Sequence, residues 1–66
     1  MTMTTNTFPP GTGAVADAMI RYGGSFVAAL GRALHCADAD NARRIRVAWP
    51  EYWATYTELA RKDGTL

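Results

Sequence analysis

The chain has 66 residues, a formal net charge of +1 and a single cysteine, Cys36. This length allows one domain, and the single cysteine excludes an internal disulfide. A charge of +1 gives no general attraction to nucleic acid or to acidic membranes. Because one histidine and one cysteine make a metal site improbable, we expect self-association to supply the extra stability that so small a core needs.

Residues 1–13 are predicted to form a flexible tail, followed by one small helical domain over residues 14–66. The tail is rich in threonine and uncharged, and it ends in Phe8-Pro9-Pro10-Gly11-Thr12-Gly13, which disfavours a helix. The first residues lack the basic and apolar regions of a secretory signal. No apolar run approaches the ~20 residues of a membrane span. The expected location is the cytoplasm, with no membrane partner.

The first helix is predicted over residues 14–22, with Thr12 as its cap and Gly23-Gly24 as its end. Its apolar face consists of Val15, Ala18, Met19 and Tyr22.

The second helix is predicted over residues 26–37, with Ser25 as its cap. Apolar residues recur there at helical spacing and define the expected core face: Phe26, Ala29, Leu30, Ala33, Leu34 and Ala37. The three alanines of this face would allow another helix to approach closely.

Two further helices are predicted over residues 39–48 and 50–61. Asp38, Asp40 and Asn41 suit the start of the third helix, because acidic and amide side chains cap helix N-termini. Its inner face is expected to hold Ala42, Ile45, Ala48 and Trp49. Pro50 disfavours helical geometry at Trp49 but is accepted in the first turn of a new helix. The fold class is therefore all-α, a bundle of three to four short helices in which helices two to four form the compact part.

The aromatic residues of the last helix region are the first candidate binding residues. They follow helical spacing: Trp49, Tyr52, Trp53 and Tyr56. One interpretation is core packing with polar tips at the edge. The other is a partner groove or a stacking platform, because Trp and Tyr are enriched at binding hot spots and stack on bases.

The basic cluster Arg43-Arg44-x-Arg46 supplies the other candidate binding residues. One interpretation is a solvated helix face balanced by Asp38, Asp40 and Glu51. The other is a clamp for phosphate or carboxylate groups, which arginine binds through two hydrogen bonds. All three arginines are expected to be exposed.

The remaining motifs predict no catalytic, cofactor-binding or metal-binding residues. A helix-turn-helix over residues 14–37 would lack polar side chains at the start of its second helix for reading bases. The Asp38-x-Asp40 pattern lacks the glycine and glutamate of a calcium loop. His35 and Cys36 lack a second histidine or an acid at a recognisable spacing, so the chain is not expected to be an enzyme.

Parts of the chain resemble short uncharacterised accessory proteins of tailed phages and prophages. The resemblance covers about residues 20–56 and lies in Tyr22-Gly-Gly-Ser-Phe-Val27, Ala29-Leu30, Ala37-Asp38 and Trp49-Pro-Glu-Tyr-Trp53. It implies an accessory protein in the bacterial cytoplasm that binds a host or phage protein, for example to inhibit a defence system. We expect a homodimer or larger oligomer. The alternative is a nucleic-acid or nucleotide-binding module that uses the arginines and the aromatic face.

Overall fold

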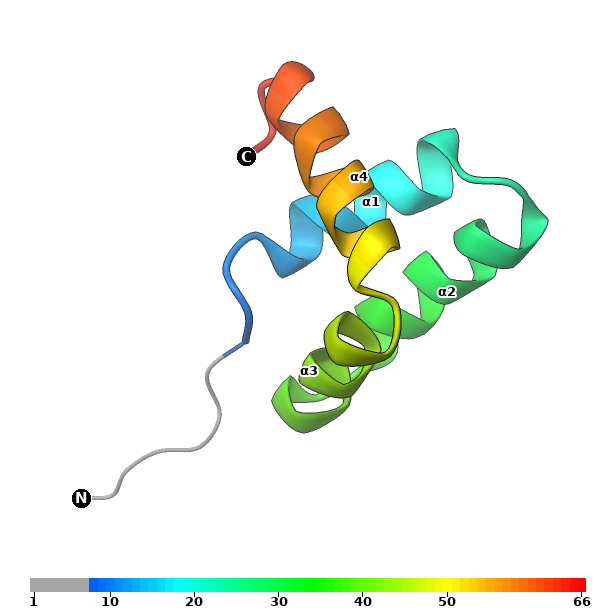
Figure 1. Ribbon diagram of the computed structural model, residues 1–66, viewed down its shortest axis with the longest axis vertical. Coiled ribbons are helices and arrows are strands. Elements are labelled where there is room, and N and C mark those ends of the chain that lie inside the picture. The colour runs from blue at the N-terminus through cyan, green and yellow to red at the C-terminus, as the bar shows by residue number, and fades with distance from the viewer. Residues whose placement is uncertain (1–7) are drawn as a thin grey trace.

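The computed structural model describes residues 8–66, which contain four α-helices and no strand. These are α1 (Thr12–Tyr22), α2 (Ser25–Cys36), α3 (Ala39–Ala48) and α4 (Pro50–Lys62) (Figure 1). The all-α prediction is confirmed, and the bounds of α3 agree with the sequence prediction. Helix α1 begins two residues earlier than predicted and α4 ends one residue later. Residues 1–7 of the predicted tail lie outside the described residues.

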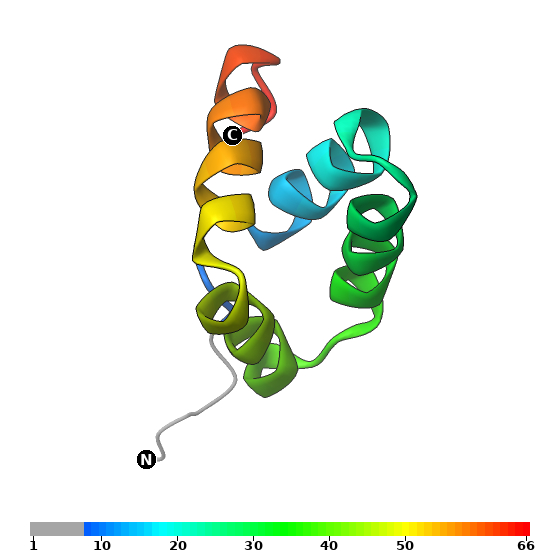
Figure 2. The same cartoon turned by 45° about the vertical axis from the view of Figure 1, so that its right-hand side comes forward.

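Helix α1 is the centre of the fold. It packs along α2 on one side and along α4 on the other, whereas α3 makes few contacts with α2 and α4 (Figures 1 and 2). Helix α3 lies across the end of the bundle, next to the end of α2 and the start of α4 (Figure 2). The expectation that helices two to four form the compact part is therefore wrong. The reason is that α1 buries four apolar side chains, while α3 buries only Ala39 and Ala42.

One of the three predicted helix caps is present. At the start of α3, the carboxylate of Asp38 accepts a hydrogen bond of 2.8 Å from the backbone N–H of Asn41. The cap predictions for Thr12 and Ser25 are wrong, because Gly11 and Gly24 occupy the capping positions and neither helix has a side-chain cap. The hydroxyl of Thr12 instead donates to the carbonyl of Pro9.

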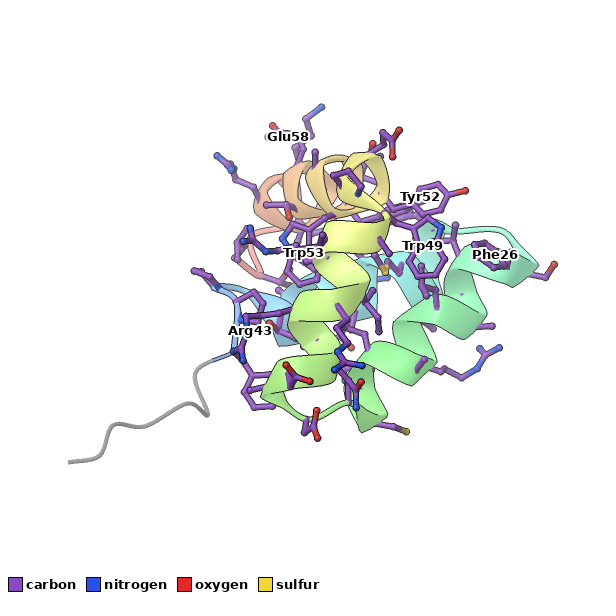
Figure 3. The ribbon with its side chains drawn as sticks, turned by 60° about the horizontal axis from the view of Figure 1, so that its bottom comes forward. Phe26, Arg43, Trp49, Tyr52, Trp53 and Glu58 are labelled. Atoms are coloured by element: carbon purple, nitrogen blue, oxygen red, sulfur yellow. The ribbon has the colours of Figure 1, made fainter. Side chains whose placement is uncertain are left out.

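The predicted break before Pro50 is confirmed. Trp49 has φ −130° and ψ 67°, outside helical geometry, and Pro50 begins α4 (Figure 3). Proline at the first helical position costs no hydrogen bond, while its ring disfavours the helical conformation of the preceding residue. The chain therefore turns a corner between α3 and α4 with a single connecting residue.

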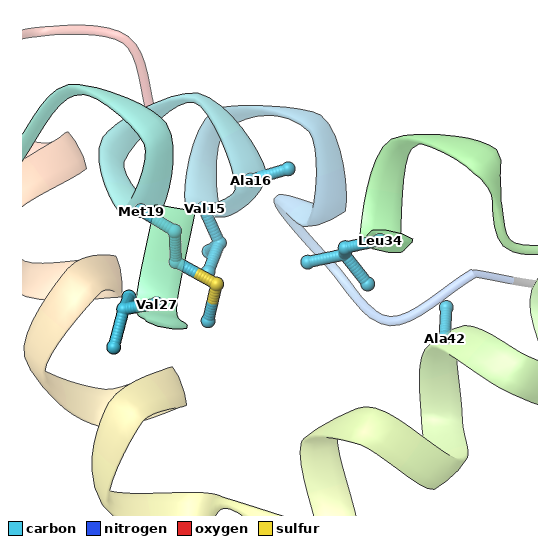
Figure 4. Packing of buried hydrophobic residues seen from close by; sticks show 6 residues of the cluster. All are labelled: Val15, Ala16, Met19, Val27, Leu34 and Ala42. Atoms are coloured by element: carbon cyan, nitrogen blue, oxygen red, sulfur yellow. The ribbon is translucent and has the colours of Figure 1, made fainter. Parts of the chain in front are cut away.

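The core lies between α1 and α2, includes one residue of α3, and is covered on one side by half-buried aromatic side chains of α4. Its buried cluster consists of Val15, Ala16, Met19, Val27, Leu34 and Ala42 (Figure 4). Ala37, Ile45, Tyr52, Trp53 and Tyr56 are partly buried and pack against this cluster.

The buried face of α2 differs from the predicted one. The buried residues are Val27, Leu30, Gly31 and Leu34, whereas Phe26, Ala29 and Ala33 are exposed. Gly31 explains the rotation of the helix, because a Cβ there would lie 2.8 Å from the carbonyl oxygen of Ala16 and 2.9 Å from the Cβ of Met19. Helices α1 and α2 thus approach most closely at a residue without a side chain.

Candidate functional site

Three aromatic rings form a cluster on one side of the α3–α4 corner. Phe26 comes from α2, Trp49 from the corner itself and Tyr52 from α4. The ring of Phe26 meets that of Trp49 edge-on, with centroids 6.0 Å apart, and its centroid lies 6.3 Å from that of Tyr52 (Figure 3). Such pairs add about 0.5–1.5 kcal/mol beyond the area that they bury. The predicted core position of Phe26 is wrong, because Phe26 is 56% exposed. The cluster is therefore open to solvent on its outer side.

The aromatic residues predicted for binding on α4 also pack against the core. Tyr52, Trp53 and Tyr56 are half-buried and pack against the buried cluster. This geometry supports core packing for one side of each ring and leaves the other side at the surface. Trp53 points to the opposite side of the corner from Trp49 and Tyr52, toward the side on which Arg43 lies (Figure 3). Trp49, Tyr52 and Trp53 are therefore divided between two surfaces.

The three candidate arginines lie on α3, where two of them pair with one carboxylate. Arg44 contacts Asp40 at 3.1 Å and Arg43 contacts it at 3.8 Å. Arg44 and Arg46 are exposed as predicted, whereas Arg43 is half-buried. Ion pairs of this kind at the surface contribute about 0.5 kcal/mol each. Asp40 therefore offsets part of the positive charge without removing it.

A groove of about 500 Å³ runs between α2 and α3. Most of its lining is apolar or small, and the polar residues Asn41 and Arg44 complete it: Ala33, Cys36, Ala37, Asn41, Arg44, Ile45, Ala48 and Trp49. It exists because α3 contacts α2 only weakly and because Ala33 and Ala37 are short. The predicted close-approach face of α2 is thus present, but none of the described helices covers it.

Three pairs of polar side chains join parts of the chain that lie 18 or more residues apart in the sequence. His35 on α2 lies 2.8 Å from the carboxylate of Asp17 on α1. After the end of α4, Asp63 accepts hydrogen bonds of 2.7 and 2.8 Å from the hydroxyl of Tyr22 and pairs with Arg21 at 3.3 Å. Contacts with Tyr22, and then with Asp63, raise the pKa of Arg21. No local sequence signal predicts the Asp63 contacts, because 41 and 42 residues separate the partners.

These polar side chains pair with one another across the fold. Among residues 8–66, no group of three or more His, Cys, Asp or Glu side chains could hold a metal ion. Within the same range, no helix is both long and apolar enough to cross a membrane.

Comparison with known proteins gave no match to a family model, a curated protein or a solved structure. The resemblance to phage accessory proteins is not tested by this result and stays a prediction.

Proposed function

We propose that this protein is a non-enzymatic binding protein that self-associates and contacts a protein target. The observation that carries the proposal is the exposure of three of the six residues of the predicted core face of α2. Phe26 is 56% exposed, and Ala29 and Ala33 are exposed beside the groove between α2 and α3. A contiguous apolar surface on a small domain is typical of an interaction site.

Self-association through this face has a physical reason. A chain of about 60 residues buries only about 60% of the surface that its unfolded form exposes, so it gains much from a second copy. The short side chains of Ala29 and Ala33 allow a helix of that copy to approach α2 closely. Most homo-oligomers of soluble proteins are two-fold dimers in which the same face meets itself. We therefore propose a homodimer built on the α2–α3 face.

The non-enzymatic part of the proposal is supported by the state of the titratable side chains. Asp17 pairs with His35, Asp40 with two arginines, Glu58 with Arg61, and Asp63 with Tyr22 and Arg21. Asp38 caps α3. A catalytic acid or base needs a position beside a substrate and a matching partner, and these side chains serve contacts within the fold instead.

The cellular setting is the part of the proposal that rests on the sequence resemblance alone. The protein would be a phage-type accessory protein in the cytoplasm of a bacterial host, and its target would be a host or phage protein, such as a component of a defence system.

Nucleic-acid binding through Arg43, Arg44 and Arg46 is the weaker alternative. Asp40 pairs with two of these arginines, and Trp53 and Tyr56 already pack against the core. Binding to a phosphate backbone would weaken steeply between low and moderate salt. A protein target held by apolar contacts would respond much less to salt.

The proposed homodimer is tested by a substitution that places a negative charge in the groove between α2 and α3. Ala33→Glu is tolerated by the fold because Ala33 is exposed, but it would bury a carboxylate in the proposed dimer. Light scattering should give a mass above 7.2 kDa for the parent chain and a monomer for the variant. Thr55→Glu, on the exposed face of α4, is the control and should leave the mass unchanged.

Affinity purification from the bacterial host, followed by mass spectrometry, tests the target. The parent chain should retain one protein through a salt wash. A strictly monomeric parent that retains no protein would contradict the proposed function.

A further inference from the structure

A second surface with apolar side chains lies on α3 and borders the groove at Arg44 and Ala48. Val47 lies in the middle of this surface. Its side chain is 72% exposed, more than that of any other large apolar residue among residues 8–66. Val47 separates two shallow depressions. One is lined by Asp40, Arg43, Arg44, Val47 and Ala48, and the other by Arg46, Val47, Pro50, Trp53 and Ala54. We call Val47 and these two depressions the α3 ridge.

The α3 ridge combines apolar contact with positive charge. Three guanidinium groups and one carboxylate, that of Asp40, line the two depressions. Arg43 and Arg44 lie one turn before Val47 on α3, and Arg46 lines the depression on the side of α4. A ligand that fills both depressions therefore meets apolar atoms in the middle and arginines at the edges.

We propose that the α3 ridge binds an acidic amphipathic helix of a partner protein. This inference rests on the proposed function and names the chemistry of the target. Apolar side chains of such a helix at positions i and i+3 or i+4 would pack on either side of Val47, as in other grooves that take a helix. Its carboxylates would meet the arginines, which bind carboxylates through two hydrogen bonds. Helix α3 is about 15 Å long, so about ten residues of the partner would span it.

The apolar side chains of the α3 ridge favour this occupant over the two others that the surface could hold. A phosphate backbone has no apolar group to pack on Val47, Pro50 and Ala54. A second copy of this chain offers Ile20 as an exposed apolar side chain with carboxylates beside it. Those carboxylates, Asp17 on α1 and Asp63 after α4, do not lie along one helix, and Arg21 beside them would meet the arginines of the α3 ridge.

The experiment begins with an unbiased selection. Random peptides of about 16 residues, long enough to cover α3 as a helix, are displayed on yeast and selected against the immobilised full chain. The enriched peptides should carry Asp or Glu at helical spacing beside Leu, Ile or Phe. One enriched peptide is then synthesised and titrated by calorimetry against variants of the protein.

The variants separate the α3 ridge from other surfaces. Val47→Ser and the double variant Arg43→Ala/Arg46→Ala, which leaves the lining of the groove unchanged, should each weaken binding by about ten-fold or more, as for central contacts of an interface. Ile20→Ser and Arg32→Ala/Arg61→Ala carry the same chemical changes at exposed positions elsewhere and should stay within about two-fold of the parent. A thermal melt of each variant checks that the fold is retained.

Four outcomes would overturn the inference. The selection could enrich no peptide, or peptides without an excess of Asp and Glu. Val47→Ser could bind the selected peptide as tightly as the parent. An oligothymidine could displace the peptide from the arginines, which would assign the surface to nucleic acid. Val47→Ser could instead turn an oligomeric parent into a monomer, which would assign the surface to a second copy. The proposed function fails separately, through the mass of the Ala33→Glu variant and the retained host protein.

Discussion

The helices packed around α1 and the helix α3 differ in what holds them in place. Val15 and Met19 on α1 and Leu34 on α2 are fully or almost fully buried, and the two helices touch at Gly31. Helix α3 buries only Ala39 and Ala42, while Val47 is exposed. A small domain has apolar side chains for one well-packed centre. The helix outside this centre therefore keeps Val47 exposed, and binding is to be sought on α3 as well as on the exposed side of α2.

The same difference predicts unequal local stability. Segments with few buried apolar contacts open at a lower free energy than the centre of a fold. We therefore expect α3 to open locally while α1 and α2 open only with global unfolding.

Met19→Ala should have the largest effect. Met19 is fully buried on α1, and truncation of such a side chain costs about 2–5 kcal/mol. A core of this size supplies only about 3–5 kcal/mol, so the variant should be largely unfolded by circular dichroism. Val47→Ala on α3 is the control and should melt like the parent. Equal losses for the two variants would show that α3 belongs to the core.

Gly31→Ala should separate α1 from α2. The added Cβ would meet the backbone of Ala16 and the Cβ of Met19 at less than 3.0 Å, and overpacking of this kind costs about 1–3 kcal/mol. Gly13→Ala is the matched control, because no atom lies within 4 Å of a Cβ at that position of α1. It should leave the unfolding free energy unchanged or raise it by up to about 1 kcal/mol. Urea titrations measure both, and a more stable Gly31→Ala would refute the close approach.

Asp38→Ala should weaken α3 alone. The loss of a capping side chain costs about 0.5–2 kcal/mol. Native-state hydrogen exchange should accelerate at the amides of α3 and stay unchanged in the middle of α1. Ser25→Ala is the control at the start of α2, where the side chain makes no capping hydrogen bond, and it should change stability by about 0.5 kcal/mol or less. Faster exchange in α1 than in α3 would remove the proposed difference between the two regions.

Asp63→Ala should have the smallest measurable effect. It removes the hydrogen bonds from Tyr22 and the ion pair with Arg21, which join the end of α4 to the end of α1 at the surface. A loss at exposed groups should lower the melting temperature by about 2–5 °C. Glu58→Ala removes a local pair with Arg61 on the same helix, and its melting temperature should fall by about 1 °C or less. Identical shifts would mean that the contact between helices adds nothing.

Local chemistry in the sequence sets two of the helix boundaries of this protein. The break at Trp49 follows from the ring of Pro50, and the start of α3 follows from the carboxylate of Asp38. These two effects act within one turn of the chain, so they do not depend on the rest of the fold. The all-α class follows in the same way, because helical periodicity is itself a local property. Gly23 ends α1 in an extended conformation, and a Cβ there would lie 2.5 Å from the side chain of Val27 on α2, so this boundary also depends on packing.

The candidate site was predicted in part. The exposure of Arg44 and Arg46 follows from their place off the apolar face of their helix. The division of the aromatics between two surfaces, the partnership of Phe26 with Trp49 and the exposure of Val47 were not predicted. Each of these depends on how helices distant in the sequence are placed against one another.

Only the tertiary structure decided which face of α2 is buried and which helix is central. Phe26 and Val27 begin two adjacent apolar stripes on α2. Helical periodicity alone does not decide which of the two stripes is buried. The buried stripe is the one that contains Gly31, because Gly31 lies close to Ala16 and Met19 on α1. These residues are 12 or more positions away from Gly31 in the sequence. With α1 in the centre, Phe26, Ala29 and Ala33 of α2 face outward and Val47 of α3 is exposed. These are the two surfaces that we propose for binding.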